Sequence, residues 1–374
     1  MMETKPIVLF VDDDPMLLAS TKRRLMSLAK DWEMHFCDSG MLALELFDRL
    51  EPAVVVTDMR MPCMDGVGLL KEVLQRFPLT VRIILSGQTE MDRLQQAHVV
   101  AHEIMRKPCE AEQVRTVVSH CLAIRQRIVQ LQVQRELLER AWLPLSPNNI
   151  SDTLMLLYDS NTRTDALTAA MRSDPEVSAC MMQRMTQIVP RVSGHPVGGV
   201  MTPESAIATV GGFAAKAIFC MMRIARRVVA KVVHPLYLEV VDSGIELGMQ
   251  VLHAACHDGK SVRFGEECLI AALFQELGKL AMYACHGEKY IDARIESVDR
   301  DSKLAEVETA MFQVNHAELG AYLLMHWSFS PHVIESVLVH DDAQWRSQSS
   351  LTSVAGHVRD VATGEHPKMR GPSA

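Results

Sequence analysis

The sequence predicts an α/β domain with a five-stranded, parallel, doubly wound sheet, followed by an all-α domain that a long helix joins to it. Short β-branched runs alternate with amphipathic segments as far as Lys107, which is the pattern of βαβ units. After Pro144 and Pro147 the apolar spacing is helical almost throughout. A chain of 374 residues also exceeds what one hydrophobic core usually supports, so two domains are expected.

The first domain, placed at 1–124, is expected to contain five strands joined by crossover helices. The predicted strands are 7–11, 33–37, 54–57, 82–85 and 103–105. Between them, segments 41–50 and 66–77 carry apolar residues three and four positions apart, as helices that cover a parallel sheet do.

A single long helix is predicted over 111–142, because this stretch has no proline or glycine. Its apolar residues recur with heptad-like steps at Val114, Val117, Cys121, Ile124, Ile128, Leu131 and Leu138. Such a helix would extend past the first domain, so we treat 125–142 as a helical linker. Its apolar seam past residue 124 needs a cover, either the next domain or the same helix of a second chain, and we expect a homodimer.

The second domain is placed at 143–362 and is expected to be all helical. Its most apolar stretch, 205–222, reaches membrane length only by including Lys216, so we interpret it as a core helix. The last residues, 363–374, hold two prolines and two glycines without a periodic apolar pattern, and we expect them to be disordered.

Composition and charge exclude several classes of protein. Hydrophobic residues make up 48% and charged residues 22% of the chain, as in an ordinary globular protein. The net charge of -8 provides no general attraction to nucleic acid or to an anionic membrane. The nine cysteines show no paired spacing and predict reduced thiols. The amino terminus lacks the pattern of a signal peptide, so we expect a cytoplasmic protein outside the membrane.

Polar side chains follow the predicted strands of the first domain. Asp12 and Asp13 come after the first strand, Asp58 after the third, Ser86 after the fourth and Lys107 after the fifth. The carboxyl ends of parallel strands meet at one edge of a sheet, so we expect these five residues in one pocket. Three carboxylates that repel one another favour a hard divalent cation, and Asp12, Asp13 and Asp58 are therefore predicted to bind Mg²⁺.

This set of residues can perform phosphoryl transfer. A carboxylate accepts a phosphoryl group as an acyl phosphate, and Asp58 is the predicted phosphoacceptor. The Lys107 ammonium is suited to one phosphoryl oxygen, and the Ser86 hydroxyl can donate a hydrogen bond to another.

The segments VVVTDMRMPCMDG, ILSG and IMRKP resemble the response-regulator receiver family over roughly the first third of the chain. The resemblance implies phosphorylation of Asp58 by a sensor histidine kinase, with Mg²⁺ held there and a switch through Ser86. The family often has an aromatic residue three positions before the lysine, and this chain has Ile104 there. A switch that uses an aromatic side chain is therefore in question.

Two later segments, LIAALFQELGKLAMYA at 269–284 and NHAELGAYLLMHW at 315–327, resemble the HDOD domain. This domain is a relative of the HD and HD-GYP phosphohydrolases, in which a His-Asp pair precedes Gly-Lys. Gln275 and Glu276 occupy that position here. The resemblance implies an output domain that binds a protein partner, as yet unidentified, and catalyses nothing.

Glu276, His316, His340 and Asp341 stand where the resemblance places a degenerate HD site. Because one imidazole ligand is missing, we expect neither a metal nor hydrolysis in the second domain. The alternative is a metal-dependent nucleotide or cyclic-dinucleotide phosphodiesterase that uses Glu276, His316 and His340.

A second alternative, a nucleic-acid-binding regulator, rests on basic residues at helical spacing: Arg223, Arg226, Arg227 and Lys231. Basic residues in this arrangement usually form a solvated helix face. The alternative is that they form a docking face for an acidic protein, a nucleotide or nucleic acid. We expect the solvated face, and no nucleic-acid partner.

Overall fold

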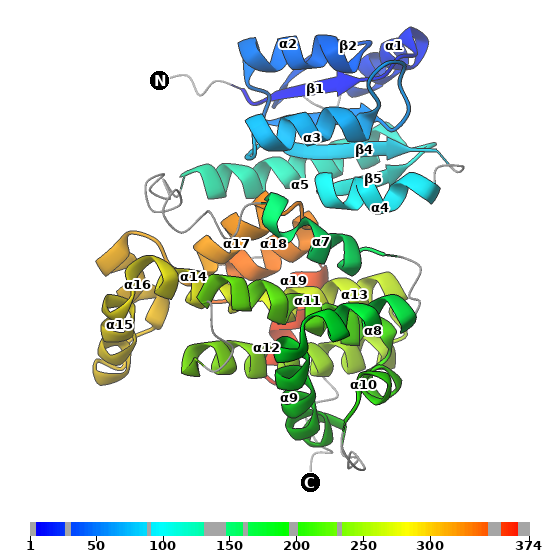
Figure 1. The fold of residues 1–374 in the computed structure, drawn as a ribbon. Helices are drawn as coiled ribbons and strands as arrows, with labels where there is room; N and C mark the ends of the chain where they lie inside the picture. The colour runs from blue at the N-terminus through cyan, green and yellow to red at the C-terminus, as the bar shows by residue number, and fades with distance from the viewer. Residues whose placement is uncertain are drawn as a thin grey trace. The chain divides into compact units, whose positions relative to one another are not determined.

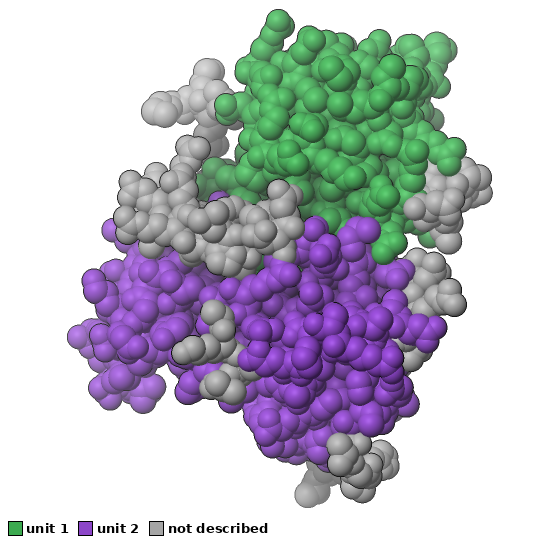
Figure 2. Space-filling view, in the orientation of Figure 1, with its two compact units in different colours: residues 1–130, 324–331 green, residues 131–323, 332–374 purple. Residues whose placement is uncertain are grey.

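The computed structural model describes residues 5–26, 31–87, 91–130, 147–159, 164–193, 201–229, 234–342 and 353–365. The chain divides into two compact units (Figure 2). The first consists of residues 1–130 and 324–331, and the second of residues 131–323 and 332–374. The division at Gln130 falls within the long helix predicted over 111–142.

A five-stranded parallel sheet forms the centre of the first unit, in the order β2-β1-β3-β4-β5. The strands are β1 (Ile7–Val11), β2 (Glu33–Cys37), β3 (Val54–Asp58), β4 (Val81–Ser86) and β5 (Glu103–Arg106). The predicted sheet is confirmed. The third, fourth and fifth strands are longer than predicted because polar residues such as Asp58 and Ser86 stay paired at their ends.

Five helices surround this sheet (Figure 1). They are α1 (Pro15–Leu25), α2 (Gly40–Leu50), α3 (Gly66–Arg76), α4 (Met91–Val100) and α5 (Ala111–Gln130). Helix α1 contacts α5, whereas α3 contacts both α2 and α4. Side chains of successive strand residues point to opposite faces, and β3 is buried along its whole length, as the central strand of a parallel sheet should be.

Gly66 sets the position of α3 against the end of β3. A Cβ atom at this residue would lie 2.1 Å from the carbonyl oxygen of Asp58. The preceding residue, Asp65, caps the helix by accepting a hydrogen bond from the backbone N–H of Gly68 (2.8 Å). The backbone at the start of α3 therefore passes close to the Asp58 carbonyl group, and a residue with a side chain would not fit at position 66.

Helix α5 extends to Gln130, and part of its apolar seam is buried within the chain. Ile124 is 7% exposed and Ile128 is 1% exposed. The Arg125 guanidinium donates to the carbonyl oxygen of Leu79 (2.8 Å). The remaining linker, including Leu131 and Leu138, lies outside the described residues, and with it the predicted dimer seam.

All described secondary structure in the second unit is helical. The helices are α7 (Pro147–Leu157), α8 (Thr164–Ser173), α9 (Pro175–Ser193), α10 (Pro203–Val210), α11 (Gly212–Val229), α12 (Pro235–His257), α13 (Val262–Phe274), α14 (Leu277–His286), α15 (Glu288–Asp299), α16 (Leu304–Phe312), α17 (His316–His326), α18 (Pro331–Val339) and α19 (Ser353–Ala362). The predicted helical class is confirmed. Residues 324–326 at the end of α17 and Pro331 at the start of α18 belong to the first unit.

Helices α11, α12 and α13 form the apolar centre of the second unit. Gly244 lets α12 approach α13, because a Cβ there would lie 2.9 Å from the carbonyl oxygen of Leu273. The single core helix predicted over 205–222 is wrong. Gly211, with φ of +87°, separates α10 from α11, and the two are bent by 120°.

Within the described residues, one stretch, Val262–His286, is long and apolar enough to cross a membrane by length and composition alone. In that stretch, 72% of the apolar window is buried inside the protein. The bent pair of α10 and α11 passes the same test only when both helices are taken as one span.

Candidate functional site

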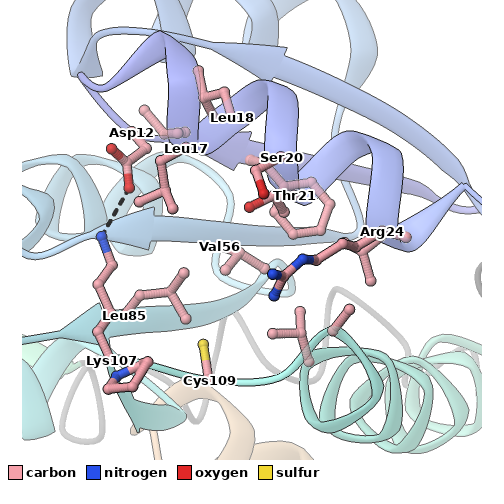
Figure 3. Close-up of a pocket in the computed structure, with 16 residues that line it drawn as sticks. Asp12, Leu17, Leu18, Ser20, Thr21, Arg24, Val56, Leu85, Lys107 and Cys109 are labelled. Carbon is pink, nitrogen blue, oxygen red and sulfur yellow. Dashed lines mark hydrogen bonds and ion pairs between the residues drawn. The ribbon is translucent and has the colours of Figure 1, made fainter.

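The carboxyl edge of the sheet brings the predicted phosphoacceptor residues together. The Lys107 ammonium donates to Asp12 Oδ2 at 2.8 Å (Figure 3). The same ammonium also contacts Asp58 Oδ1. Asp13 follows Asp12 at the end of β1, and its side chain is exposed.

The backbone fixes one oxygen of each buried carboxylate. Asp12 Oδ1 accepts from the backbone N–H of Asp14 (3.0 Å), and Asp58 Oδ2 accepts from that of Arg60 (2.8 Å). Asp12 is 7% exposed and Asp58 is 8% exposed. The second oxygen of each carboxylate therefore points to Lys107, and both face one small region.

Lys107 stays charged in this environment. Burial lowers the pKa of its ammonium, but hydrogen bonds with Asp12 and Asp58 outweigh burial, and the net pKa is raised above its ordinary value. A fixed positive charge beside Asp58 is what an incoming phosphoryl group requires.

The donor set at this edge fits Mg²⁺. Carboxylate oxygens are the ligands that this hard cation takes in proteins, and Asp12 and Asp58 already converge on one cation, the ammonium of Lys107. The exposed carboxylate of Asp13 lies next to Asp12 in the chain. These three residues would hold the ion.

The two predicted switch residues occupy neighbouring strands. Ser86 is 2% exposed, and its hydroxyl donates to the carbonyl oxygen of Gly87 (3.2 Å). Asp58 pairs with Leu85, so Ser86 is the residue that follows the partner of Asp58 on β4. Ile104 pairs with Ile84 on β5 and packs against the apolar core. It contributes apolar contact where the family often has an aromatic ring.

A cavity of about 460 Å³ between the sheet, α1 and α5 is lined in part by Asp12 and Lys107 (Figure 3). Arg24 and Cys109 also line it, and burial raises the pKa of the Cys109 thiol. Sequence reasoning missed this cavity. Its lining comes from three strands, two helices and the loop between β5 and α5, so no local motif marks it.

The second unit brings Glu276, His316, His340 and Asp341 together, although they come from three chain segments. Glu276 precedes α14, His316 begins α17, and His340 and Asp341 follow α18. His316 Nε2 lies 3.3 Å from His340 Nε2, 3.2 Å from Asp341 Oδ2 and 3.6 Å from Glu276 Oε2. His340 Nε2 lies 3.7 Å from Glu276 Oε1 and 3.9 Å from Asp341 Oδ1.

Further residues orient this cluster. His316 Nδ1 lies 2.7 Å from Glu308 Oε2, and the fully buried Glu308 also accepts from the Tyr290 hydroxyl (2.8 Å). His340 Nδ1 lies 2.7 Å from the carbonyl oxygen of Val337. Sequence reasoning missed Glu308 and Tyr290, because a glutamate and a tyrosine eighteen residues apart form no motif.

The two imidazoles differ in their affinity for a proton. Burial lowers the pKa of His316, but hydrogen bonds with Asp341 and Glu308 raise it to about 9. Burial lowers the pKa of His340 below its ordinary value, and the neighbouring His316 lowers it further. The hydrogen bond from His316 holds the pKa of Asp341 far below its usual range.

The predicted basic face is largely neutralised within the second unit. Arg226 contacts Asp174 (2.8 Å) and Glu176 (2.5 Å), and Arg223 lies 3.6 Å from Asp174. Arg227 is half-buried, and burial lowers the pKa of its guanidinium. Lys231 lies outside the described residues. The face is therefore not a free basic surface at Arg223 and Arg226.

Two family models match this chain, one in its amino-terminal part and one in its helical part. A family model of the response regulator receiver domain matches residues 8–119. A family model of the HDOD domain matches residues 143–343, more than half of the chain.

Two curated relatives match about a third of this chain. The regulatory protein AtoC of Escherichia coli is 28% identical over 139 residues, which are 36% of this chain and 29% of AtoC. The DNA-binding transcriptional regulator NtrC of the same species is 29% identical over 118 residues, or 31% of this chain and 25% of NtrC. The match thus spans less than a third of either relative.

Solved structures match the same region. The signal receiver domain of an HD domain-containing protein from Pseudomonas fluorescens is 25% identical and covers 33% of this chain and 98% of its own, with a TM-score of 0.31. A response regulator receiver domain from Clostridium thermocellum is 26% identical over similar shares, also with a TM-score of 0.31.

Proposed function

Because the chain belongs to the HDOD family and carries an amino-terminal response regulator receiver domain, we propose that phosphorylation of Asp58 controls the binding of a partner by the helical domain. The observation that carries this proposal is the convergence of Asp12 and Asp58 on Lys107. A carboxylate held beside a fixed ammonium at the edge of a parallel sheet is arranged to receive a phosphoryl group.

In the proposed reaction, a carboxylate oxygen of Asp58 attacks the phosphorus of a phosphohistidine on a sensor kinase. A P–O bond forms as the P–N bond breaks, and the leaving imidazole takes a proton from solvent. Asp12, Asp13 and Asp58 would hold Mg²⁺, which would supply positive charge to the transferred oxygens. Lys107 exchanges its contact with the Asp58 carboxylate for one with a phosphoryl oxygen.

The signal leaves the site through Ser86. Its hydroxyl donates to Gly87 in the unphosphorylated protein and would turn to a phosphoryl oxygen once Asp58 is modified. Ser86 ends β4 and α4 is the next helix in the chain, so a rotation of Ser86 would change the conformation at the start of the connection to α4. Ile104 takes part in this movement only through its apolar contacts, because it has no aromatic ring.

The helical domain supplies the output. HDOD domains are a non-catalytic family related to HD proteins. We propose a protein partner for this domain, a homodimer formed through the linker, and a cytoplasmic location. The ion pairs of Arg223 and Arg226 with Asp174 argue against nucleic acid as the partner.

The test is to incubate the full chain with acetyl phosphate and Mg²⁺ and to measure phosphorylation by intact-protein mass spectrometry. We expect one phosphoryl group on the wild type and none on Asp58→Asn. Asp48→Asn, an exposed aspartate on α2, is the matched control and should label as the wild type does.

Lys107→Ala should slow labelling by about tenfold or more, since one charge-assisted contact is lost. Equal labelling of Asp58→Asn and the wild type would reject Asp58 as the phosphoacceptor. Equal labelling rates of Lys107→Ala and the wild type would reject the assigned role of the ammonium.

A further inference from the structure

We propose that Glu276, His316, His340 and Asp341 bind one zinc ion in a closed, four-coordinate site that joins three segments of the helical domain. The inference is independent of phosphorylation, and it reverses the expectation that the second domain binds no metal. It concerns a structural ion, because four protein ligands leave no open position for activating water.

The distances between the donor atoms carry the proposal. In a tetrahedral zinc site with bonds of about 2.0–2.1 Å, neighbouring donor atoms lie about 3.4 Å apart. The Nε2 atoms of the two imidazoles are 3.3 Å apart. His316 Nε2 lies 3.2 Å from Asp341 Oδ2 and 3.6 Å from Glu276 Oε2, and His340 Nε2 lies 3.7 Å from Glu276 Oε1 and 3.9 Å from Asp341 Oδ1. One donor atom from each of Glu276, His316 and His340 lies within 4.8 Å of the other two.

Hydrogen bonds orient both imidazoles for this role. Glu308 faces Nδ1 of His316, and the Val337 carbonyl oxygen faces Nδ1 of His340. With the Nδ1–H groups used in this way, Nε2 of each imidazole faces the cluster, and a metal ion would replace the proton that His316 Nε2 donates to Asp341. A carboxylate or carbonyl behind each histidine is the arrangement that metal-bound histidines usually have.

The charge of the cluster matches a divalent ion. Glu276, Glu308 and Asp341 contribute three negative charges, and Lys279, 2.8 Å from Glu276 Oε2, contributes one positive charge. With both imidazoles neutral, these groups leave two negative charges, which one Zn²⁺ neutralises. Lys279 contacts Oε2 of Glu276, and Oε1 of the same carboxylate faces His340 Nε2 at 3.7 Å.

The Glu276 side chain is not used to cap a helix. It stands at the amino end of α14, where a side chain often caps the helix, but its own side chain makes no capping hydrogen bond. A cavity of about 200 Å³, lined by Glu276, His340, Asp341 and Arg359, gives an ion a route to the cluster. Mixed nitrogen and oxygen donors at tetrahedral spacing favour zinc over the all-oxygen ligation of magnesium.

The test uses the full chain, stripped with a chelator and held in millimolar Mg²⁺ so that the receiver site does not take up zinc. Zinc is titrated in competition with a chromogenic chelator. We expect one equivalent to bind tightly, with affinity reduced at least about tenfold in Asp341→Asn and about a hundredfold in His340→Gln. Asp341 is 39% exposed, so its substitution keeps the test valid if His340→Gln fails to fold.

The two control variants change an aspartate and a histidine that are not proposed ligands. Asp342→Asn changes the next residue in the chain, and His357→Gln changes a buried histidine whose Nε2 lies 3.2 Å from the Val251 carbonyl oxygen. Both should bind zinc as the wild type does. Equal affinity in the wild type, Asp341→Asn and His340→Gln would overturn the proposal, as would the absence of tight zinc binding by the wild type.

Cobalt substitution separates this site from adventitious binding by the nine cysteines. Co²⁺ bound by two imidazoles and two carboxylates in a tetrahedron absorbs strongly in the visible range and lacks a thiolate-to-cobalt band in the near ultraviolet. We expect that spectrum from the wild type and its loss in His340→Gln. A thiolate band that persists in the variant would place the ion elsewhere and overturn the assignment.

Discussion

At the scale of single residues, His102 shows how burial turns a titratable group into a pH-dependent term in stability. It is 3% exposed, and its Nδ1 accepts a hydrogen bond from the backbone N–H of Arg82 (3.0 Å). Burial lowers the pKa of His102 well below 6.5, and the charge of Arg82 lowers it further. A proton on Nδ1 would also abolish the bond from Arg82, so the folded state keeps this imidazole neutral.

The unfolded chain binds this proton below about pH 6.5, whereas the folded chain does not, so stability must fall as the pH drops. We expect the stability advantage of the wild type over His102→Asn to shrink by up to about 1.4 kcal/mol per pH unit below pH 6.5. Asn keeps an acceptor near Nδ1 but does not titrate.

Urea denaturation of both full-length proteins between pH 7.5 and 5.5, followed by circular dichroism, measures this difference. A constant difference across that range would show that His102 titrates normally in the folded state.

At the scale of elements, helix packing depends on Gly278 at the start of α14. A Cβ at this position would lie 1.8 Å from the carbonyl oxygen of His316, the first residue of α17. Gly278→Ala must therefore separate the two helices, and we expect it to lower the free energy of unfolding by about 1–3 kcal/mol or more.

Gly356→Ala on α19 is the matched control. Among the described residues, nothing lies within 4 Å of a Cβ built there, so the helical preference of alanine should leave stability unchanged or raise it by about 0.5–1 kcal/mol. Urea denaturation of the full chain compares the two variants. Equal midpoints for Gly278→Ala and the wild type would contradict the close approach of α14 to α17.

For the whole molecule, self-association depends on which apolar residues of the long helical segment remain available to a second chain. Ile124 and Ile128 are buried within a single chain, so a dimer seam has to use apolar positions past Gln130. We expect the wild type to sediment as a dimer, and Leu131→Arg with Leu138→Arg to sediment as a monomer, because charges in a helical seam are not tolerated.

Gln132→Arg, a polar position of the same stretch, should leave the dimer intact. Sedimentation velocity of the full chain over a range of concentrations measures each species. A wild type that stays monomeric at high micromolar concentration would exclude this seam.

The sequence by itself determined the five strands of a parallel sheet, the change from α/β to all-helical structure, and the residues at the carboxyl edge of the sheet. Strand periodicity is local, and parallel topology places the ends of strands side by side, so Asp12, Asp58 and Lys107 could be grouped before any coordinates. Strand ends were predicted one residue short, because polar residues such as Ser86 interrupt the apolar pattern while their backbones remain paired.

Only the tertiary structure decided which charged side chains of the helical domain contact one another. Glu308 behind His316, Lys279 beside Glu276, and Asp174 against Arg226 each became partners through the packing of helices. Helical periodicity tells which side of a helix is buried, but the angle and offset at which two helices cross depend on all the side chains between them. Ligand geometry and the neutralisation of basic residues therefore follow from packing between helices, which a local pattern of residues does not encode.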